Sequence, residues 1–176
     1  GQVITVFVED ATENEEAAGV FVYDGLGDMT GVELFEGHLS LSADETATTS
    51  ISQLAAGDHS AIGDEDVFFD VAAGDLNVCG VGTCPNANLY IGSGNVFVPA
   101  STSPATLSTH DLINDGTLEL DGNTVNVSGS WENNGTYAAD TSTINFTATA
   151  GSETLTDVSD TLVFNNLTFG VGTGTA

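Results

Sequence analysis

The sequence contains no lysine and no arginine, although 26 of its 176 residues are Asp or Glu. An average domain of this length carries about twenty basic residues, because roughly a quarter of its residues are charged. Positive side-chain charge can therefore come only from three histidines, which argues against a nucleic-acid, phosphate or anionic-lipid ligand. The formal charge of −26 also repels itself, so we expect salt or bound cations to stabilise the compact state.

Long apolar segments and common catalytic motifs are also missing. No run approaches the roughly 18 apolar residues that a membrane-spanning helix needs, so we do not expect membrane insertion. The sequence holds no G-x-S-x-G and no P-loop, and the Gly/Thr run at 170–175 lacks the flanks of a phosphate-binding loop. The chain begins at Gly1 and shows no signal peptide, which is typical of a processed product or an internal segment of a longer protein.

There are only two cysteines, Cys79 and Cys84, in the run CGVGTC. Zinc and redox motifs do not use this spacing with two cysteines alone. We expect a short disulfide that closes a glycine-rich hairpin, which would imply an oxidising compartment. The alternative is a pair of free, buried thiols in a reducing cytosol.

Apolar residues come in short bursts that alternate with polar residues, which is the period of a β-strand. The clearest bursts span 2–8, 19–24, 66–71, 95–99 and 143–149. No segment shows a sustained helical period. The acidic stretch at 11–19 lacks an apolar face, so we expect it to form a loop or a single turn. The sequence therefore predicts an all-β fold.

An internal repeat is the most informative feature of the sequence. Residues 115–129 (DGTLELDGNTVNVSG) match residues 134–148 (NGTYAADTSTINFTA) at an offset of 19. Glycine, threonine, aspartate and asparagine recur at matching positions, and the apolar positions agree in kind. A further copy of the pattern is expected at 89–98, with its apolar positions at Leu89, Ile91, Val96 and Val98.

A period near 20 residues, with strands and no helix, is typical of a β-solenoid in which each repeat forms one coil. Coils stacked about 4.8 Å apart pair in parallel and share one apolar core. We expect this arrangement over residues 64–170, with an antiparallel hairpin or sandwich as the alternative. The turns Asp115–Gly116 and Asn134–Gly135 should form corners with positive φ. The predicted inward core stack comprises Leu118, Leu120, Val125, Val127, Tyr137, Ile144 and Phe146.

The repeat and the phrase SGSWENNGTYAADTSTINFTATAGSETLTDVSDTLVFNNLTFG at 128–170 resemble repeat modules of large bacterial surface proteins, including filamentous-haemagglutinin-like β-solenoids. In such proteins comparable phrases follow a short sandwich-like module. The segments GQVITVFVEDATE at 1–13 and GVELFEGHLSLS at 31–42 resemble that junction. The missing Lys and Arg depart from the pattern of these repeats. The resemblance implies a secreted structural or adhesive role and supplies no catalytic residues.

On this basis residues 1–60 are expected to form a small, incomplete β-sandwich-like module, and residues 61–176 the solenoid-like repeats. Three candidate strands are too few for a closed sandwich. A neighbouring subunit could complete the sheet by strand addition, as in pilin-like polymers. The alternative is that the first segment is simply the first strand of its own sheet. The candidate exchange strand contains Val3, Ile4, Val6 and Val8.

No catalytic residues are predicted. His38, His59 and His110 lack metal-ligand spacing, so we expect them to be structural or surface residues. The abundant carboxylates could supply oxygen ligands for calcium, the one cofactor that the composition favours, with a diffuse counterion atmosphere as the alternative. The candidate calcium ligands are Glu9, Asp10, Glu13, Asp24, Asp28, Asp64 and Asp66.

Four Asn-x-Ser/Thr sequons mark candidate glycosylation sites at Asn126, Asn134, Asn145 and Asn166. Taken together, these features predict a non-enzymatic structural subunit or repeat of an extracellular, cell-surface fibre, sheath or adhesin, with copies of itself or neighbouring repeats as partners. One alternative is a pilin-like subunit that polymerises by donor-strand exchange. The other is a carbohydrate-binding or polysaccharide-cleaving β-solenoid, whose partners would be surface glycans.

Overall fold

The computed structural model describes residues 1–8, 17–30, 32–43, 48–58, 69–78, 87–100, 104–148, 153–158 and 162–170. These residues are nearly all in strands, turns and short connections, as the alternating pattern predicts. The strands are β1 (Gln2–Val8), β2 (Ala17–Tyr23), β3 (His38–Ala43), β4 (Thr48–Thr49), β5 (Phe69–Ala72), β6 (Asp75–Val78), β7 (Asn88–Ile91), β8 (Val96–Phe97), β9 (Thr106–Thr109), β10 (Leu112–Asn114), β11 (Thr117–Glu119), β12 (Thr124–Val127), β13 (Trp131–Asn133), β14 (Thr136–Ala138), β15 (Thr143–Phe146), β16 (Leu155–Asp157) and β17 (Asn166–Phe169), and the helix is α1 (Ile51–Gly57).

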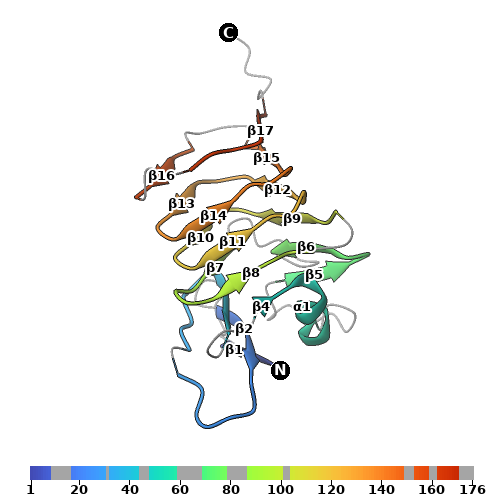
Figure 1. The fold of residues 1–176 in the computed structure, drawn as a ribbon, viewed down its shortest axis with the longest axis vertical. Coiled ribbons are helices and arrows are strands. Elements are labelled where there is room, and N and C mark those ends of the chain that lie inside the picture. Colours follow the sequence, from blue (N-terminus) through green and yellow to red (C-terminus); the bar gives the residue numbers. More distant parts are fainter. Residues whose placement is uncertain are drawn as a thin grey trace.

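The strands form a β-solenoid of about six turns, stacked along the long axis of the molecule (Figure 1). Successive coils contribute successive strands to each of three sheets. Sheet A has the order β1-β2-β3-β7-β10-β13-β16, sheet B the order β14-β11-β8-β4, and sheet C the order β17-β15-β12-β9-β6-β5. The prediction of an all-β, solenoid-like fold is therefore confirmed, and the antiparallel sandwich considered for the repeat is not what forms.

The offset of 19 residues is the register between neighbouring coils. Strand β12 pairs in parallel with β15, so that Val125 lies opposite Ile144. Strand β11 pairs in parallel with β14, so that Leu118 lies opposite Tyr137. Each side chain therefore stacks on its equivalent in the next coil, which is why residues of the same kind recur at this spacing.

A single apolar core runs through the stack from Ala18 in β2 to Phe146 in β15. Alternate residues of each strand point into it, and the others face outward. Tyr137 is half-buried and packs against this core. The remaining members of the predicted core stack, all buried, are Leu118, Leu120, Val125, Val127, Ile144 and Phe146.

The corners differ from the prediction in their backbone conformation. Positive φ occurs at Asp121 (44°), Gly122 (83°) and Asp140 (45°), and not at Asp115–Gly116 or Asn134–Gly135. Glycine at 116 and 135 is required for another reason. A Cβ atom at Gly135 would overlap the Gly116 carbonyl oxygen of the preceding coil, and one at Gly116 would meet that of Gly92. These corners approach their neighbours too closely for any side chain.

In 89–98 the predicted positions Leu89 and Ile91 are fully buried in the core, whereas the inward positions of the second half are shifted by one residue from those predicted. Phe97 is fully buried and lies opposite Leu118, whereas Val96 lies opposite the outward Thr117 and is, like Val98, only half-buried. The turn that contains Gly94, with φ of 81°, sets this register. One residue of shift in a strand moves every side chain to the opposite face.

A separate N-terminal sandwich is not confirmed. Strand β2 pairs in parallel with β3, and β3 pairs in parallel with β7, so both strands extend sheet A and line the common core. Strand β1 pairs antiparallel with β2, with Gln2 opposite Tyr23, and forms the edge of the same sheet. The described residues of the first 60 therefore continue the coil stack.

The short helix α1 covers the N-terminal end of the core and was not expected from the sequence. It contacts β1, β2 and β5 (Figure 1). Ile51 and Leu54, three residues apart, point inward and are buried. Seven residues are too few to show a sustained helical period, which explains why the pattern did not reveal it.

We expect Ile144→Ala to lower the free energy of unfolding by about 2–5 kcal/mol, because the Ile144 side chain is fully buried in the apolar core. Leu167→Ala is the matched control. Leu167 pairs with Ile144 in the next coil but is 38% exposed, so its truncation should cost less than half as much. Urea unfolding followed by circular dichroism measures both values, and equal losses would contradict a core that opens at the last coil.

Candidate functional site

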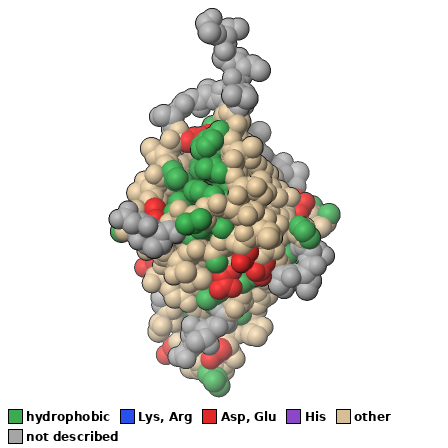
Figure 2. Space-filling view, turned by 45° about the horizontal axis from the view of Figure 1, so that its top comes forward, with side chains coloured by type: hydrophobic (Ala, Val, Ile, Leu, Met, Phe, Trp, Pro, Cys, Tyr) green, Lys and Arg blue, Asp and Glu red, His purple; other side chains and the backbone are tan. Residues whose placement is uncertain are grey.

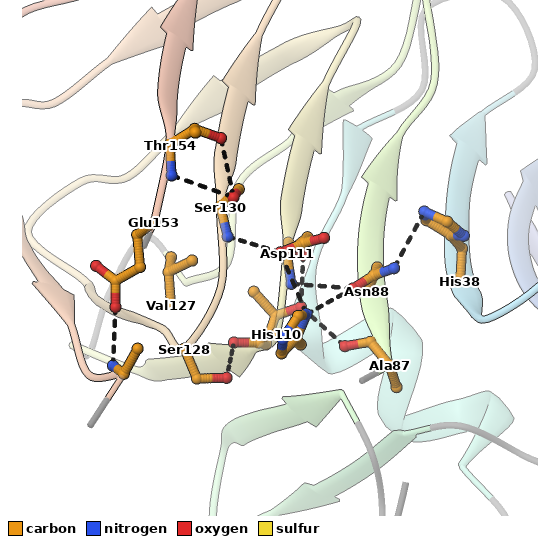
Figure 3. Close-up of polar contacts among 12 residues, drawn as sticks. His38, Ala87, Asn88, His110, Asp111, Val127, Ser128, Ser130, Glu153 and Thr154 are labelled. Carbon is orange, nitrogen blue, oxygen red and sulfur yellow. Dashed lines mark hydrogen bonds and ion pairs between the residues drawn. The ribbon is translucent and has the colours of Figure 1, made fainter. Parts of the chain in front are cut away.

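A column of polar side chains follows the corner where sheet C leads into sheet A (Figure 3). Its members come from successive coils: His38, Asn88, Asp111, Ser130 and Thr154. Asn88 Oδ1 accepts the backbone N–H of Asp111 at 3.0 Å, and Asp111 Oδ1 accepts that of Ser130 at 2.6 Å. Ser130 Oγ accepts the backbone N–H of Thr154 at 3.2 Å. The side chains of Asn88, Asp111 and Ser130 thus each accept a backbone N–H of the next coil at this corner.

His38 belongs to this column and His110 lies beside it, and both histidines have partners within the chain. His38 Nε2 lies 3.4 Å from Asn88 Nδ2, and its Nδ1 lies 2.6 Å from the Glu36 carbonyl oxygen. His110 Nδ1 lies 3.3 Å from Asn88 Oδ1 and 3.2 Å from Asp111 Oδ1. The third histidine, His59, lies outside the described residues.

Gly129 makes room for this arrangement. A Cβ atom at Gly129 would overlap the Asp111 carboxylate and the His110 ring. The glycine therefore allows the imidazole and the carboxylate to lie against the backbone of the next coil. The column therefore joins neighbouring coils at this corner through hydrogen bonds from backbone N–H groups to side-chain oxygens.

A second polar column is buried inside the coil stack. Asn114 Nδ2 donates to Asn133 Oδ1 at 2.7 Å, and Asn133 Nδ2 donates to Asp157 Oδ1 at 2.8 Å. Both asparagines are buried. The column starts at Asn114 because Ile91 occupies the equivalent position in the preceding coil. Asn114 Oδ1 has no hydrogen-bond partner among the described residues.

This buried ladder was missed by the sequence analysis, although a signal was present. Asn114 and Asn133 are also 19 residues apart, but the aligned segments began one residue later. An asparagine side chain can donate to one neighbour and accept from the other. Two asparagines separated in the sequence by the length of one coil therefore indicate a hydrogen-bonded ladder.

The four sequon asparagines occupy different environments. Asn145 Nδ2 donates to Asn126 Oδ1 at 2.9 Å, and Asn126 Nδ2 donates to Ser108 Oγ at 3.2 Å, so both belong to an outward ladder on sheet C. Asn134 is exposed, and its Nδ2 donates to Asp115 Oδ1 at 2.8 Å. Asn166 is also exposed. Glycosylation of these residues stays a prediction. Asn134 and Asn166 are the more accessible sites for attachment of a glycan, because both are exposed.

Two of the seven predicted calcium ligands, Asp24 and Asp28, lie within the described residues. Asp24 and Asp28 are exposed, and Asp24 Oδ1 accepts the backbone N–H of Leu26 at 2.6 Å, which stabilises a turn. The other five candidate ligands and both cysteines lie outside the described residues. Within the described ranges, no group of three or more His, Asp or Glu side chains could hold a metal ion.

The candidate exchange strand pairs within its own chain. In β1, Val3 and Ile4 are half-buried, whereas Val6 and Val8 are exposed. All four pair with β2 residues. The strand forms one edge of sheet A, so its outer edge has no strand neighbour among the described residues.

The C-terminal coil is open to solvent at positions that are buried elsewhere. Leu167 and Phe169 lie opposite the buried Ile144 and Phe146, and Leu155 lies opposite the buried Trp131. Leu155, Leu167 and Phe169 are nevertheless 48%, 38% and 65% exposed. Figure 2, in which the C-terminal end is turned forward, shows hydrophobic side chains gathered in a band that runs from this end. We call these three residues the open end.

Two tyrosines have raised pKa values. Burial raises the pKa of Tyr90 well above its usual value, and the hydrogen bond that Tyr90 donates to Asp115 Oδ2 at 3.0 Å raises it further. Burial also raises the pKa of Tyr137, whose ring lies edge-on to Trp131 with centroids 5.2 Å apart. Both phenols are therefore held in the neutral form.

Comparison of the chain with protein-family models, with curated proteins and with solved structures found no match. None of the described helical residues forms a segment long and apolar enough to cross a membrane.

We expect Asn133→Ala to lower the free energy of unfolding by about 1–3 kcal/mol, because it removes a buried acceptor and a buried donor from the ladder. Its neighbour Asn134 is exposed, so Asn134→Ala should change stability by no more than about 0.5 kcal/mol. Chemical denaturation of both variants measures the difference. Equal losses of unfolding free energy in the two variants would show that the buried ladder does not stabilise the fold more than an exposed asparagine does.

The tyrosines predict an alkaline limit to stability. An unfolded tyrosine ionises near pH 10, whereas Tyr90 and Tyr137 ionise later in the folded state. Their contribution to stability is full below about pH 10 and falls as the pH rises above it, because the unfolded state then releases protons that the folded state retains. Phenolate absorbance should show that Tyr90 and Tyr137 ionise at higher pH in the folded chain than in the urea-unfolded chain, which is the control.

Proposed function

We propose that the chain is a non-enzymatic structural element of an extracellular surface fibre, sheath or adhesin, in which the coil stack itself is the functional product. The observation that carries the proposal is the single apolar core, surrounded by parallel strand ladders, that extends from Ala18 to Phe146. An element of this kind holds its two ends apart at a fixed distance, because each coil is fixed to both of its neighbours.

The polar columns support this role. The ladder from Asn114 to Asp157 adds side-chain hydrogen bonds between strands that already pair. At the corner between sheets C and A, the side chains of Asn88 and Asp111 bind the next coil. Asn114 Oδ1 has no partner among the described residues, but a shifted register would separate the buried amides from the partners that they do have, which favours the observed arrangement over sliding alternatives. The register of the coils is therefore fixed by side chains as well as by the backbone, which suits a rigid spacer.

Composition supports an exposed location. The absence of Lys and Arg leaves no site for trypsin-like proteases, and the high net charge favours solubility. The predicted disulfide between Cys79 and Cys84 belongs to an oxidising compartment. These features are consistent with a surface protein that meets proteases and solvent directly.

Immunogold electron microscopy of the source cells tests the proposal. Antibodies raised against the chain should label filaments, a sheath or the outer surface, and antibodies pre-absorbed with the chain should not. Label confined to the cell interior would overturn the proposal. Mass spectrometry of the native chain should also show the loss of two hydrogens at Cys79 and Cys84.

A second candidate function, binding of a neutral polysaccharide, is favoured by one surface. The outward side chains of sheet C form two columns of small, uncharged, hydrogen-bonding residues on a chain of charge −26. These columns contain Thr106, Thr124, Thr143, Ser108, Asn126 and Asn145. A glycan array probed with the chain and with Thr124→Asp tests this function. Binding that Thr124→Asp abolishes would support it, whereas no binding by the unchanged chain would exclude it for the glycans displayed.

A further inference from the structure

We propose that one buried water molecule binds between the side chains of Asn95 and Asn114 and joins two separate sets of hydrogen bonds into a single ladder along the inside of the coil stack. The inference does not depend on the proposed function, because it concerns the hydrogen bonding of buried amides. Its starting point is that Asn95 Nδ2, a donor, and Asn114 Oδ1, an acceptor, are both buried without a hydrogen-bond partner among the described residues.

These two amide groups are buried too deeply to be satisfied by bulk solvent. Asn95 is 1% exposed and Asn114 is fully buried. A buried donor or acceptor without a partner destabilises the fold, so native structures rarely leave one unpaired. Here the unpaired atoms are one donor and one acceptor, so a single ligand that both accepts and donates can satisfy them together.

Both side chains lie in neighbouring coils at the corner where sheet A leads into sheet B. The backbone N–H of Thr117 donates to the Asn95 carbonyl oxygen at 2.8 Å, so Asn95 lies against the coil that holds Asn114. The Asn114 amide spans this corner, because its Nδ2 donates to the Thr136 carbonyl oxygen at 2.9 Å. Thr136 stacks on Thr117, and Thr117 stacks on Val96. Because Asn95 directly precedes Val96, the Asn114 amide extends toward the side of the corner on which Asn95 lies.

The direction of the hydrogen bonds on either side agrees with a bridge at this place. On the N-terminal side, Thr49 Oγ1 donates to Asn95 Oδ1 at 2.8 Å, which leaves Asn95 Nδ2 to donate onward. On the C-terminal side, Asn114 Nδ2 donates to Asn133 Oδ1, and Asn133 Nδ2 donates to Asp157 Oδ1. Each of these side chains donates to a residue nearer the C-terminus. Within the described residues, this series of donors and acceptors is interrupted between Asn95 and Asn114.

Water fits this interruption better than other ligands do. Thr49 and Asn133 hold the two amides in orientation from the far sides, and no direct hydrogen bond joins the amides to each other. Buried polar groups that are separated by more than hydrogen-bonding distance are commonly bridged by water. A cation would meet the Asn95 donor and an anion the Asn114 acceptor, whereas water accepts from the first and donates to the second.

The bridge would carry the ladder past Ile91, the apolar residue that occupies the position equivalent to Asn114 in the preceding coil. The completed ladder would run from Thr49 in β4 to Asp157 in β16. The register of the earlier coils would then be fixed by buried amides in the same way as that of the later ones.

Nuclear magnetic resonance of the full, isotope-labelled chain tests this proposal. The Asn95 Nδ2 hydrogens should show a nuclear Overhauser cross-peak to a long-lived water molecule, because the bridging water lies within hydrogen-bonding distance of them. Asn123 is the matched control in the same chain. It is also fully buried, but its Nδ2 donates to the carbonyl oxygens of Ala100 and Leu120 at 2.8 and 2.5 Å. Its hydrogens should therefore show no such cross-peak.

Two variants identify the source of the cross-peak. Asn114→Leu removes the acceptor and should abolish it, whereas Thr49→Val removes the hydroxyl that binds Asn95 and should leave it in place. Circular dichroism establishes that each variant is folded, and Asn114→Ala replaces Asn114→Leu if the latter is not. Absence of a long-lived water at Asn95 in the unchanged chain would overturn the proposal without reference to any variant. A cross-peak that survives loss of the Asn114 amide, or that disappears in Thr49→Val, would overturn it as well.

Discussion

The structure depends on main-chain hydrogen bonding between coils that are stacked about 4.8 Å apart. At this distance and in this register, each side chain lies directly over its equivalent in the next coil. A residue type is therefore suitable only if it can stack on the residue above it. Apolar side chains do so in the core, glycine does so at the corners where Gly135 meets Gly116, and asparagine does so in the ladders, because an amide both donates and accepts.

The same constraint determines where acidic residues can lie. With no Lys or Arg to neutralise them, two carboxylates opposite each other in a sheet would repel without compensation. Among the registered pairs of the described strands, a carboxylate always lies opposite a neutral residue, as Glu119 does opposite Ala138 and Glu132 opposite Thr156. Asp157 accepts a hydrogen bond at the end of the asparagine ladder, where a residue that only accepts is sufficient.

The repeat at an offset of 19 was enough to predict the solenoid and the inward residues of two neighbouring coils, the one that contains β11 and β12 and the one that contains β14 and β15. The first coils could not be predicted in the same way, because α1 and the β5–β6 hairpin lie between β3 and β7 and interrupt the period. Those strands consequently resembled a separate sandwich. The role of Gly116 and Gly135 was also misjudged, because the contact that requires glycine lies between coils and cannot be seen within one. The buried asparagine ladder was missed because the aligned segments began one residue after Asn114 and Asn133.

The two ends of a solenoid determine what it can assemble into. Each internal coil is buried on both sides, so a terminal coil must either be capped or find a partner. Here α1 covers the core at one end. At the other end Leu162 and Phe164 pack against the core, while Leu155, Leu167 and Phe169 are exposed. Among the described strands, each end of the stack therefore presents a sheet edge without an outer strand neighbour, β1 at one end and β16 and β17 at the other.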